Sequence, residues 1–274
     1  MKKTLKIFSS IILLAFLFAS CGGKDAAESE ASVPEPVNLA VEEPVDLAAE
    51  EPVDLAAGDE EASTGEGSME ACAQEVSLPD EPAIPLVLCD NFEDAETSVM
   101  PAVEDENKWG ALKTEVYNGK YTARVEVKRD NAMWLPVPSD ELRDFIFQVD
   151  GALTSHSGHP YHSWGVYFKA DEETENYYYF LIDNNQYYYF TLIRGENRTN
   201  LINGRKSEDL NPLDESNTIT IACDGSTYSF YINGKFQEDF SDNRLQSGRI
   251  GIYSEMRENT TLDWEFDNMV LYAP

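Results

Sequence analysis

From residue 86 onward, short runs of apolar and aromatic residues alternate with turn residues. Dipeptides such as Asn118-Gly119 and Asn233-Gly234 supply the positive φ that hairpin corners need. Helical periodicity is nearly absent, except around residues 139–142. The pattern predicts an all-β, two-sheet antiparallel sandwich of roughly a dozen strands. The expected strands are 86–89, 113–116, 120–127, 131–135, 144–149, 163–170, 177–183, 187–194, 218–224, 227–232, 248–253 and 262–272.

The N-terminal pattern is different. Lysines precede an apolar run over residues 7–18, which is too short to span a bilayer, and Ala19 and Ser20 then precede Cys21. This arrangement resembles the lipobox of bacterial lipoproteins, although Phe18 stands where that family prefers Leu. The resemblance implies that residues 1–20 are a lipoprotein signal peptide and that Cys21 becomes the lipidated N-terminus. We therefore expect an exported protein anchored to the outer membrane or cell surface.

Residues 21–85 are acidic and rich in proline. Residues 22–85 hold 18 Asp and Glu against the single Lys24, and an octapeptide containing Glu-Pro-Val repeats three times over residues 35–58. Proline at this spacing forbids one continuous helix, and two apolar side chains per repeat cannot offset the entropy of ordering. The segment is predicted to be a disordered stalk that carries the next domain, 86–274. The alternatives are a short solenoid and a repeated partner-binding motif.

The formal net charge is −31 over 274 residues. This excess argues against nucleic acid or anionic lipid head groups as ligands, because both require clustered Lys and Arg. The membrane partner is therefore expected through the lipid anchor alone.

Three cysteines remain if Cys21 carries lipid: Cys72, Cys89 and Cys223. Export places them where disulfides form, but their odd number allows at most one internal bridge. Cys72 could pair with either of the others, or it could stay free while Cys89 packs as a small strand residue. The sequence leaves the pairing open.

An ordered series of motifs runs through the predicted sandwich: Trp109, Gly119-Lys120-Tyr121, Trp164-Gly165-Val166-Tyr167-Phe168-Lys169, Tyr177-Tyr178-Tyr179-Phe180-Leu181-Ile182, Asn217-Thr218-Ile219-Thr220, Asp224-Gly225, Phe230-Tyr231-Ile232-Asn233-Gly234, Gly248-Arg249-Ile250-Gly251-Ile252 and Phe266-Asp267-Asn268-Met269-Val270. It is similar to the concanavalin/laminin-G-like jelly rolls, in particular the bacterial family 16 glycoside hydrolase-like domains of unknown function. The resemblance implies an antiparallel jelly roll whose concave sheet often binds glycans, although enzymes and binding modules share this fold.

Two strands carry aromatic residues on both faces, in runs that begin at Tyr177 and Tyr187. Only one face of each strand can fill the core. On the first strand this is expected to be the face of Tyr178 and Phe180; on the second strand either alternating set could face outward. The other face is expected to form an aromatic surface. Such a surface stacks on sugars while amides and guanidinium groups bond their hydroxyls, but cross-strand pairing alone also explains it. The predicted ligand-binding residues are Trp164, Tyr177, Tyr179, Tyr187, Tyr189 and Arg194.

The nearest match to a glycosidase site is Asp263, Glu265 and Asp267, which share one face of the last predicted strand. Their order and strand differ from those of true hydrolases, so a solvated strand face is the favoured interpretation. An alternative is that Asp267 helps to hold a structural Ca²⁺ through oxygen ligands. No cofactor is required by any motif.

All three histidines lie within seven residues, His156, His159 and His162. Imidazole is a common metal ligand, and a Gly-Pro loop could bring three rings around one ion. No carboxylate or cysteine accompanies them, so a polar loop between strands is the favoured interpretation.

The sequence thus favours a surface-tethered module that binds glycan or another cell-envelope polymer over an enzyme, because it shows no convincing catalytic pair. A glycoside hydrolase-like enzyme and a structural or protein-interaction lipoprotein without a small ligand remain as alternatives.

Overall fold

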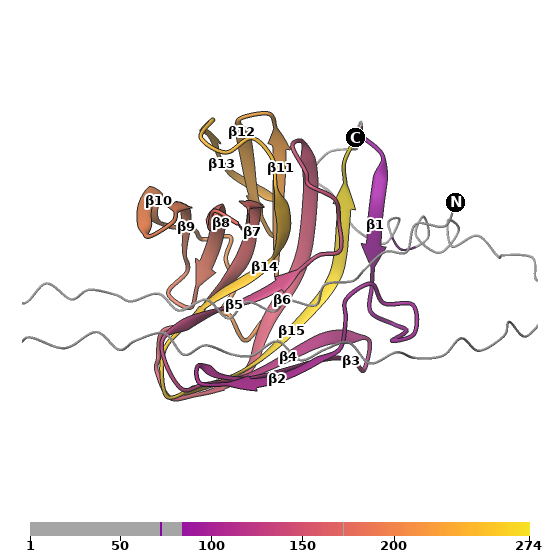
Figure 1. The fold of residues 1–274 in the computed structure, drawn as a ribbon, viewed down its shortest axis with the longest axis vertical. Helices are drawn as coiled ribbons and strands as arrows, with labels where there is room; N and C mark the ends of the chain where they lie inside the picture. Colours follow the sequence, from indigo (N-terminus) through magenta and orange to yellow (C-terminus); the bar gives the residue numbers. More distant parts are fainter. Residues whose placement is uncertain (1–71, 73–83, 172) are drawn as a thin grey trace, which may run out of the picture. The chain divides into compact units, whose positions relative to one another are not determined.

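A computed structural model describes Cys72 and residues 84–171 and 173–274. The predicted signal peptide, Cys21 and the repeats of the stalk lie outside the described residues. Within 84–171 and 173–274 every regular element is a β-strand, and all strand pairs are antiparallel. The predicted all-β antiparallel sandwich is confirmed (Figure 1).

The larger sheet has nine strands in the order β13-β12-β11-β6-β15-β4-β3-β2, with β1 paired to β15. Although β15 is the last strand of the chain, it lies inside this sheet between β6 and β4 (Figure 1). The nine strands are β1 (Leu86–Asp90), β2 (Val103–Asn107), β3 (Gly110–Tyr117), β4 (Lys120–Val127), β6 (Phe145–Ser157), β11 (Asn217–Asp224), β12 (Thr227–Ile232), β13 (Lys235–Ser241) and β15 (Thr260–Tyr272).

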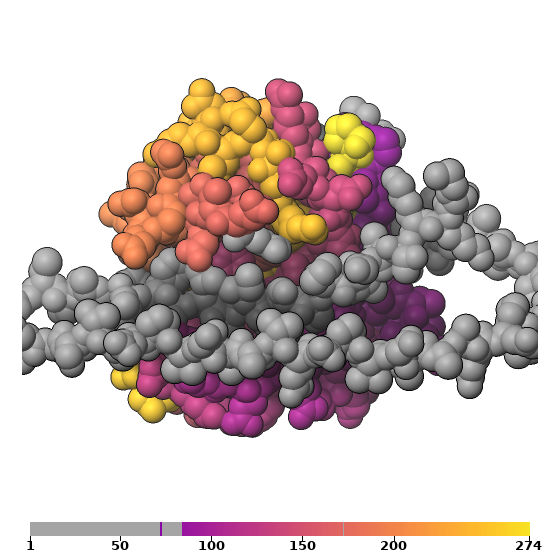
Figure 2. Space-filling view, viewed as in Figure 1, coloured from indigo at the N-terminus to yellow at the C-terminus, as the bar shows by residue number. Residues whose placement is uncertain are grey.

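The smaller sheet has six strands in the order β10-β9-β8-β7-β14-β5. In space-filling form, the orange atoms of β9 and β10 lie at one edge of the domain (Figure 2). The six strands are β5 (Asn131–Pro136), β7 (Ser163–Asp171), β8 (Asn176–Asp183), β9 (Tyr187–Arg194), β10 (Asn197–Lys206) and β14 (Arg249–Met256).

The main core fills the space between the two sheets with alternate residues of their strands. Trp164 of β7 contacts Phe266 of β15, with ring centroids 5.6 Å apart, and Phe180 of β8 stacks on Phe230 of β12 at 4.5 Å. Large aromatic side chains therefore join one sheet to the other and fix the face that each strand turns outward.

Three strands, β2, β10 and β13, were not predicted from the sequence. Each lies at an edge of its sheet and is dominated by polar and charged residues. Edge strands bury little and often carry charge, so the apolar alternation that marks inner strands is weak in them. The helical hint around residues 139–142 was wrong, because Leu142 forms an isolated bridge with Gly248.

Cys72 and Cys89 form a disulfide with their Cα atoms 6.0 Å apart. The thiol of Cys223 is free and buried. Both halves of the bridge pack against Val270 of β15, so the covalent link joins the segment before the sandwich to the edge strand β1. Of the pairings left open by the sequence, the structure thus contains the one between the two N-terminal cysteines.

No helix among the described residues is long and apolar enough to cross a membrane.

Candidate functional site

In the two aromatic runs, which lie on β8 and β9, successive side chains point to opposite faces of the smaller sheet, as strand alternation predicts. Tyr178 and Phe180 of β8 point into the main core, whereas Tyr177 and Tyr179 lie on the outer face of the smaller sheet. On β9 the core takes Tyr188, Phe190 and Leu192. Because successive strand residues point to opposite faces, Tyr187 and Tyr189 belong to the outer face.

Tyr177 and Tyr179 do not form the open surface that was expected. They are 3% and 0% exposed and belong to a second apolar cluster on the outer face. Trp134 of β5 lies 4.5 Å from the Tyr177 ring and 4.9 Å from the Tyr253 ring, and Tyr253 stacks on Tyr179 at 5.1 Å. Rings from three strands pack side by side, which limits direct access to these two tyrosines.

Trp164 is also not accessible to a ligand. It is 0% exposed and belongs to the main core. The alternation of β7 turns Ser163 and Gly165 outward and Trp164 inward. The expectation that Trp164 contacts a ligand is therefore corrected.

An open part of the outer face lies at the β8–β9 turn. Tyr187 is 37% exposed, and Tyr189 and Tyr161 are partly exposed. The electrostatic neighbours of the Tyr189 hydroxyl are Asp183, Tyr161 and Tyr187. We call Tyr161, Tyr187, Tyr189 and Asp183 the tyrosine cluster.

Asp183 holds the tyrosine cluster together. Its Oδ2 accepts a hydrogen bond from the Tyr189 hydroxyl at 3.0 Å, and its Oδ1 accepts one from the backbone N–H of Tyr187 at 2.9 Å. Gly204 of β10 lies under the Tyr189 ring, since a Cβ there would approach that ring to 2.8 Å. The orientation of Tyr189 is thus fixed from two sides.

The environment of Tyr161 joins the cluster to β14. The pKa of Tyr161 is raised to about 12, mainly because the residue is buried and secondly because the negative charges of Asp183 and Glu255 are near. The Tyr161 hydroxyl is therefore neutral at physiological pH and can donate a hydrogen bond. Two carboxylates, those of Asp183 and Glu255, contribute to the electrostatic potential at this hydroxyl.

Glu255 is held by groups from two other strands. Its Oε1 accepts hydrogen bonds from Arg198 Nη1 at 2.8 Å and from the Tyr179 hydroxyl at 3.0 Å. The Arg198 guanidinium also lies over the Tyr179 ring, 5.4 Å from its centroid. This arrangement places a positive group and an acceptor on the outer face beside the buried aromatic rings.

Arg194 lies apart from the tyrosine cluster. Arg194 is the last residue of β9. By strand alternation its side chain is on the same side of the sheet as Tyr188, Phe190 and Leu192, but it lies past the end of the core and is exposed. There it lines a pocket with Arg244. Arg194 is thus exposed, but it does not border the predicted aromatic surface.

The three histidines partly converge. β6 continues through His156, so the connecting loop is shorter than expected. The rings of His156 and His162 have centroids 4.4 Å apart, and His162 is only 2% exposed. Among the described residues, no group of three or more His, Cys, Asp or Glu is arranged to hold a metal ion.

The carboxylates of β15 lie on the other sheet. Leu262, Trp264 and Phe266 face the core, which leaves Asp263, Glu265 and Asp267 on the opposite face. Asp263 pairs with Arg124 at 3.1 Å, and Asp267 pairs with Lys120. A Ca²⁺ at Asp267 would have to displace the Lys120 ammonium. These contacts agree with a solvated, ion-paired strand face.

Several groups of the outer face were not singled out from the sequence, namely Tyr161, Asp183, Trp134, Arg198 and Glu255. Asp183 is the last residue of a predicted strand and alternates with Tyr177 and Tyr179. Its position on the outer face could therefore have been predicted from the sequence. The others come from different strands or loops, and nothing in their local sequence marks them.

Comparisons with protein-family models and with curated protein sequences find no match. Solved structures of jelly-roll proteins do match in fold. One is a laminarinase catalytic domain from Thermotoga maritima, with a TM-score of 0.51, 10% identity, and coverage of 70% of this chain and 99% of that chain.

A GlcNAcα1-4Gal-releasing endo-β-galactosidase from Clostridium perfringens matches with a TM-score of 0.53, 10% identity, and coverage of 73% of this chain and 65% of that chain. A Bacillus subtilis protein of unknown function with a galectin-like fold matches with a TM-score of 0.50, 11% identity, and coverage of 69% and 96%. At this identity the matches define the class of fold alone: the sandwich is a jelly roll of the kind found in glycoside hydrolases.

Proposed function

We propose that the protein is a glycan-binding module and that the tyrosine cluster is its contact with sugar. The observation that carries this proposal is the grouping of three partly exposed tyrosines around one carboxylate on the outer face of the smaller sheet. Apolar sugar faces stack on aromatic rings, and phenol, amide and carboxylate groups bond sugar hydroxyls. The jelly-roll neighbours that act on glycans support the proposal by analogy.

Tyr187 is the residue to test, because its ring is the most exposed of the cluster and its hydroxyl has no hydrogen-bond partner among the described residues. Binding of the full chain to laminarin and to β-galactan is measured by affinity electrophoresis and calorimetry. We expect Tyr187→Ala to weaken binding by about tenfold, the loss that corresponds to about 1.4 kcal/mol.

Tyr117→Ala is the matched control, because Tyr117 is 63% exposed at the end of β3 in the other sheet. Equal loss of binding in both variants, or unchanged binding in Tyr187→Ala, contradicts the assignment of the tyrosine cluster. Absence of binding to a broad glycan array removes the function itself.

A glycoside hydrolase is the second candidate. Asp183 and Glu255 both contribute to the raised pKa of Tyr161, so two carboxylates serve one region of the outer face. Each already accepts hydrogen bonds from two or more groups, however, which favours binding over catalysis. Release of reducing ends from a bound glycan, abolished in Glu255→Gln, would establish the enzyme.

We further propose that Cys21 anchors this module to a membrane and that the acidic stalk separates the two. The support is the lipobox-like sequence and the composition of residues 22–85. Metabolic labelling of the full chain with an alkynyl fatty acid in a bacterial host tests the anchor. We expect labelling that is lost in Cys21→Ser and retained in Cys223→Ser.

A further inference from the structure

A second polar site lies where the start of β8, the end of β9 and the start of β10 adjoin Arg244 of the loop between β13 and β14. The pocket has a volume of about 460 Å³. Among the described residues, its lining contains two arginines, two asparagines, a threonine and a glycine, and no carboxylate. The lining residues are Asn176, Arg194, Gly195, Asn197, Thr199 and Arg244.

Arg194 brings an unneutralised charge to the pocket. Among the described residues, its guanidinium has no hydrogen-bond or ion-pair partner. Glu175 and Glu196 adjoin pocket residues in the sequence, but neither lines the pocket. In a chain with a formal net charge of −31, a concave surface whose described lining carries free positive charge and no acidic side chain is unusual.

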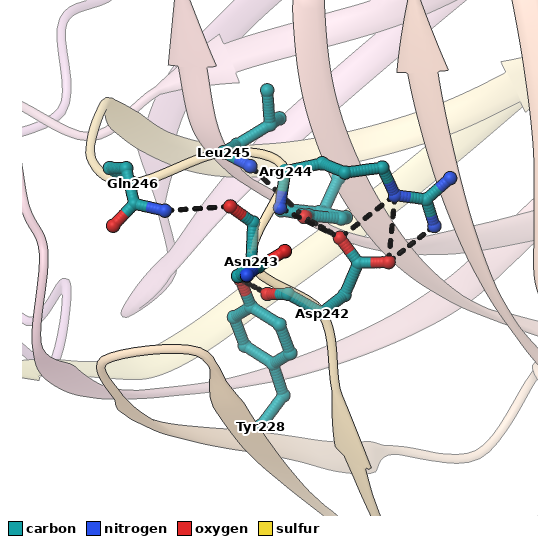
Figure 3. A network of polar contacts seen from close by, with 7 residues as sticks. Tyr228, Asp242, Asn243, Arg244, Leu245 and Gln246 are labelled. Atoms are coloured by element: carbon teal, nitrogen blue, oxygen red, sulfur yellow. Dashed lines mark hydrogen bonds and ion pairs between the residues drawn. The ribbon is translucent and has the colours of Figure 1, made fainter.

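Arg244, in contrast, is held rigidly. Asp242 accepts hydrogen bonds from Arg244 Nε at 2.8 Å, from the Arg244 backbone N–H at 3.0 Å and from its Nη2 (Figure 3). The Tyr178 hydroxyl, on a ring in the main core, donates to the same carboxylate at 2.5 Å. The backbone N–H of Leu245 donates in turn to the Tyr178 hydroxyl at 3.2 Å, which fixes the loop.

This network presents one side of the Arg244 guanidinium to Asp242 and leaves the other side available. Nη1 of Arg244 has no hydrogen-bond partner among the described residues. A planar guanidinium fixed along one edge keeps its remaining donors pre-organised, so little entropy is lost when they bind an oxyanion. The pocket therefore offers one guanidinium without a partner among the described residues, that of Arg194, and one that Asp242 holds in place, that of Arg244.

We propose that this pocket binds the anionic group of an acidic sugar, either the carboxylate of a uronic acid or a sulfate ester. Both groups present several oxygen acceptors to guanidinium donors. The amides of Asn176 and Asn197 and the hydroxyl of Thr199 are suited to the sugar hydroxyls beside the anion. The proposal does not rest on the tyrosine cluster, because Arg194 lies on the opposite phase of β9 from Tyr187 and Tyr189.

The test measures binding of four probes to the full chain by calorimetry and ligand-observed NMR: D-glucuronate, D-glucose 6-sulfate, inorganic sulfate and D-glucose. We expect at least one of the two acidic sugars to bind more tightly than D-glucose, and its affinity to fall as the salt concentration rises. Which acidic sugar binds identifies the anion. Arg194→Gln, which keeps a polar side chain but removes the charge, is expected to reduce that affinity by about tenfold or more.

Arg143→Gln is the control, because Arg143 is an exposed arginine outside the pocket. Arg194→Lys should retain part of the affinity. The proposal is overturned if neither acidic sugar binds more tightly than D-glucose, if inorganic sulfate is the only ligand, or if Arg194→Gln binds as tightly as Arg143→Gln. Loss of glycan binding in Tyr187→Ala with retained binding of the acidic sugar would separate this site from the tyrosine cluster.

Discussion

The Tyr189 hydroxyl donates a hydrogen bond to Oδ2 of Asp183 at 3.0 Å across the β8–β9 hairpin. Oδ1 of the same carboxylate accepts the backbone N–H groups of Asn185 and Tyr187, each at 2.9 Å. Asp183 is 1% exposed, so one buried carboxylate shapes the turn and orients the partly exposed tyrosine beside it. The turn and the proposed sugar contact therefore depend on the same side chain.

Asp183→Ala removes the acceptor for three donors. We expect the free energy of unfolding to fall by about 2–4 kcal/mol, because two part-buried backbone N–H groups and the Tyr189 hydroxyl lose a charged acceptor. Tyr189→Phe removes a single hydrogen bond and should cost about 1 kcal/mol. Urea denaturation followed by tryptophan fluorescence measures both. Asp140→Ala, at an exposed position, is the control, and a loss of stability equal to that of Asp183→Ala would contradict the role of Asp183.

Much of the fold follows from local pattern. The limits of β4, β9 and β12 agree with the predicted strands, because each alternates between residues that face the core and residues that do not. The inward phase of Tyr178 and Phe180 was also predicted correctly. The edge strands were missed because polar residues dominate them.

The candidate site was less predictable, because its parts come from distant segments. Tyr161 belongs to the loop before β7, Asp183 ends β8 and Glu255 lies on β14, so only the order of strands in the sheet brings them together. The low exposure of Tyr177 similarly involves Trp134, whose strand is far away in the sequence. Periodicity assigns a side chain to a face, but it does not say which other strands share that face.

The disulfide between Cys72 and Cys89 closes a loop with a sequence separation of 17 residues. Restricting a loop of this size in the unfolded chain stabilises the fold by about 3 kcal/mol. We therefore expect dithiothreitol to lower the free energy of unfolding of the full chain by about this amount. Thermal or urea denaturation with and without reductant measures it.

The variant Cys72→Ser/Cys89→Ser separates this effect from any action of the reductant on Cys223. Burial, opposed by the nearby Lys169 ammonium, raises the pKa of the Cys223 thiol to about 11, so it should react slowly with alkylating reagents at pH 8. A reductant that destabilises the double variant as much as the natural chain would contradict the bridge.

His162 makes stability depend on pH in the acidic range. The pKa of His162 is lowered from 6.5 to about 4, mainly because the ring is buried and secondly because of electrostatic repulsion from His156 and His159. The unfolded chain therefore takes up a proton below pH 6.5, whereas the folded chain does so only near pH 4. Stability should be unaffected above pH 6.5 and should fall between pH 6.5 and 4, by at most about 3 kcal/mol in total.

The measurement is the difference in unfolding free energy between the natural chain and His162→Gln at several pH values, since the titrating groups that do not interact with His162 cancel in that difference. An NMR titration of the His162 ring protons gives the pKa directly. A pKa near 6.5, or a difference that does not change between pH 7 and 4, would contradict the prediction.

Gly165 lies in β7 between Trp164 and Val166, which both point into the core. A Cβ at Gly165 would meet the backbone oxygen of Phe180 at 1.9 Å, so any side chain must push β7 and β8 apart. We expect Gly165→Ala to lower stability by about 3 kcal/mol, because the strain falls on paired backbone and not on a flexible side chain. Gly234→Ala is the control: no atom lies within 4 Å of its added Cβ, and its φ of +72° should cost only about 1 kcal/mol. Equal losses of unfolding free energy in the two variants, measured by urea denaturation, would contradict this prediction. They would mean that β7 and β8 can move apart at Gly165 with little cost.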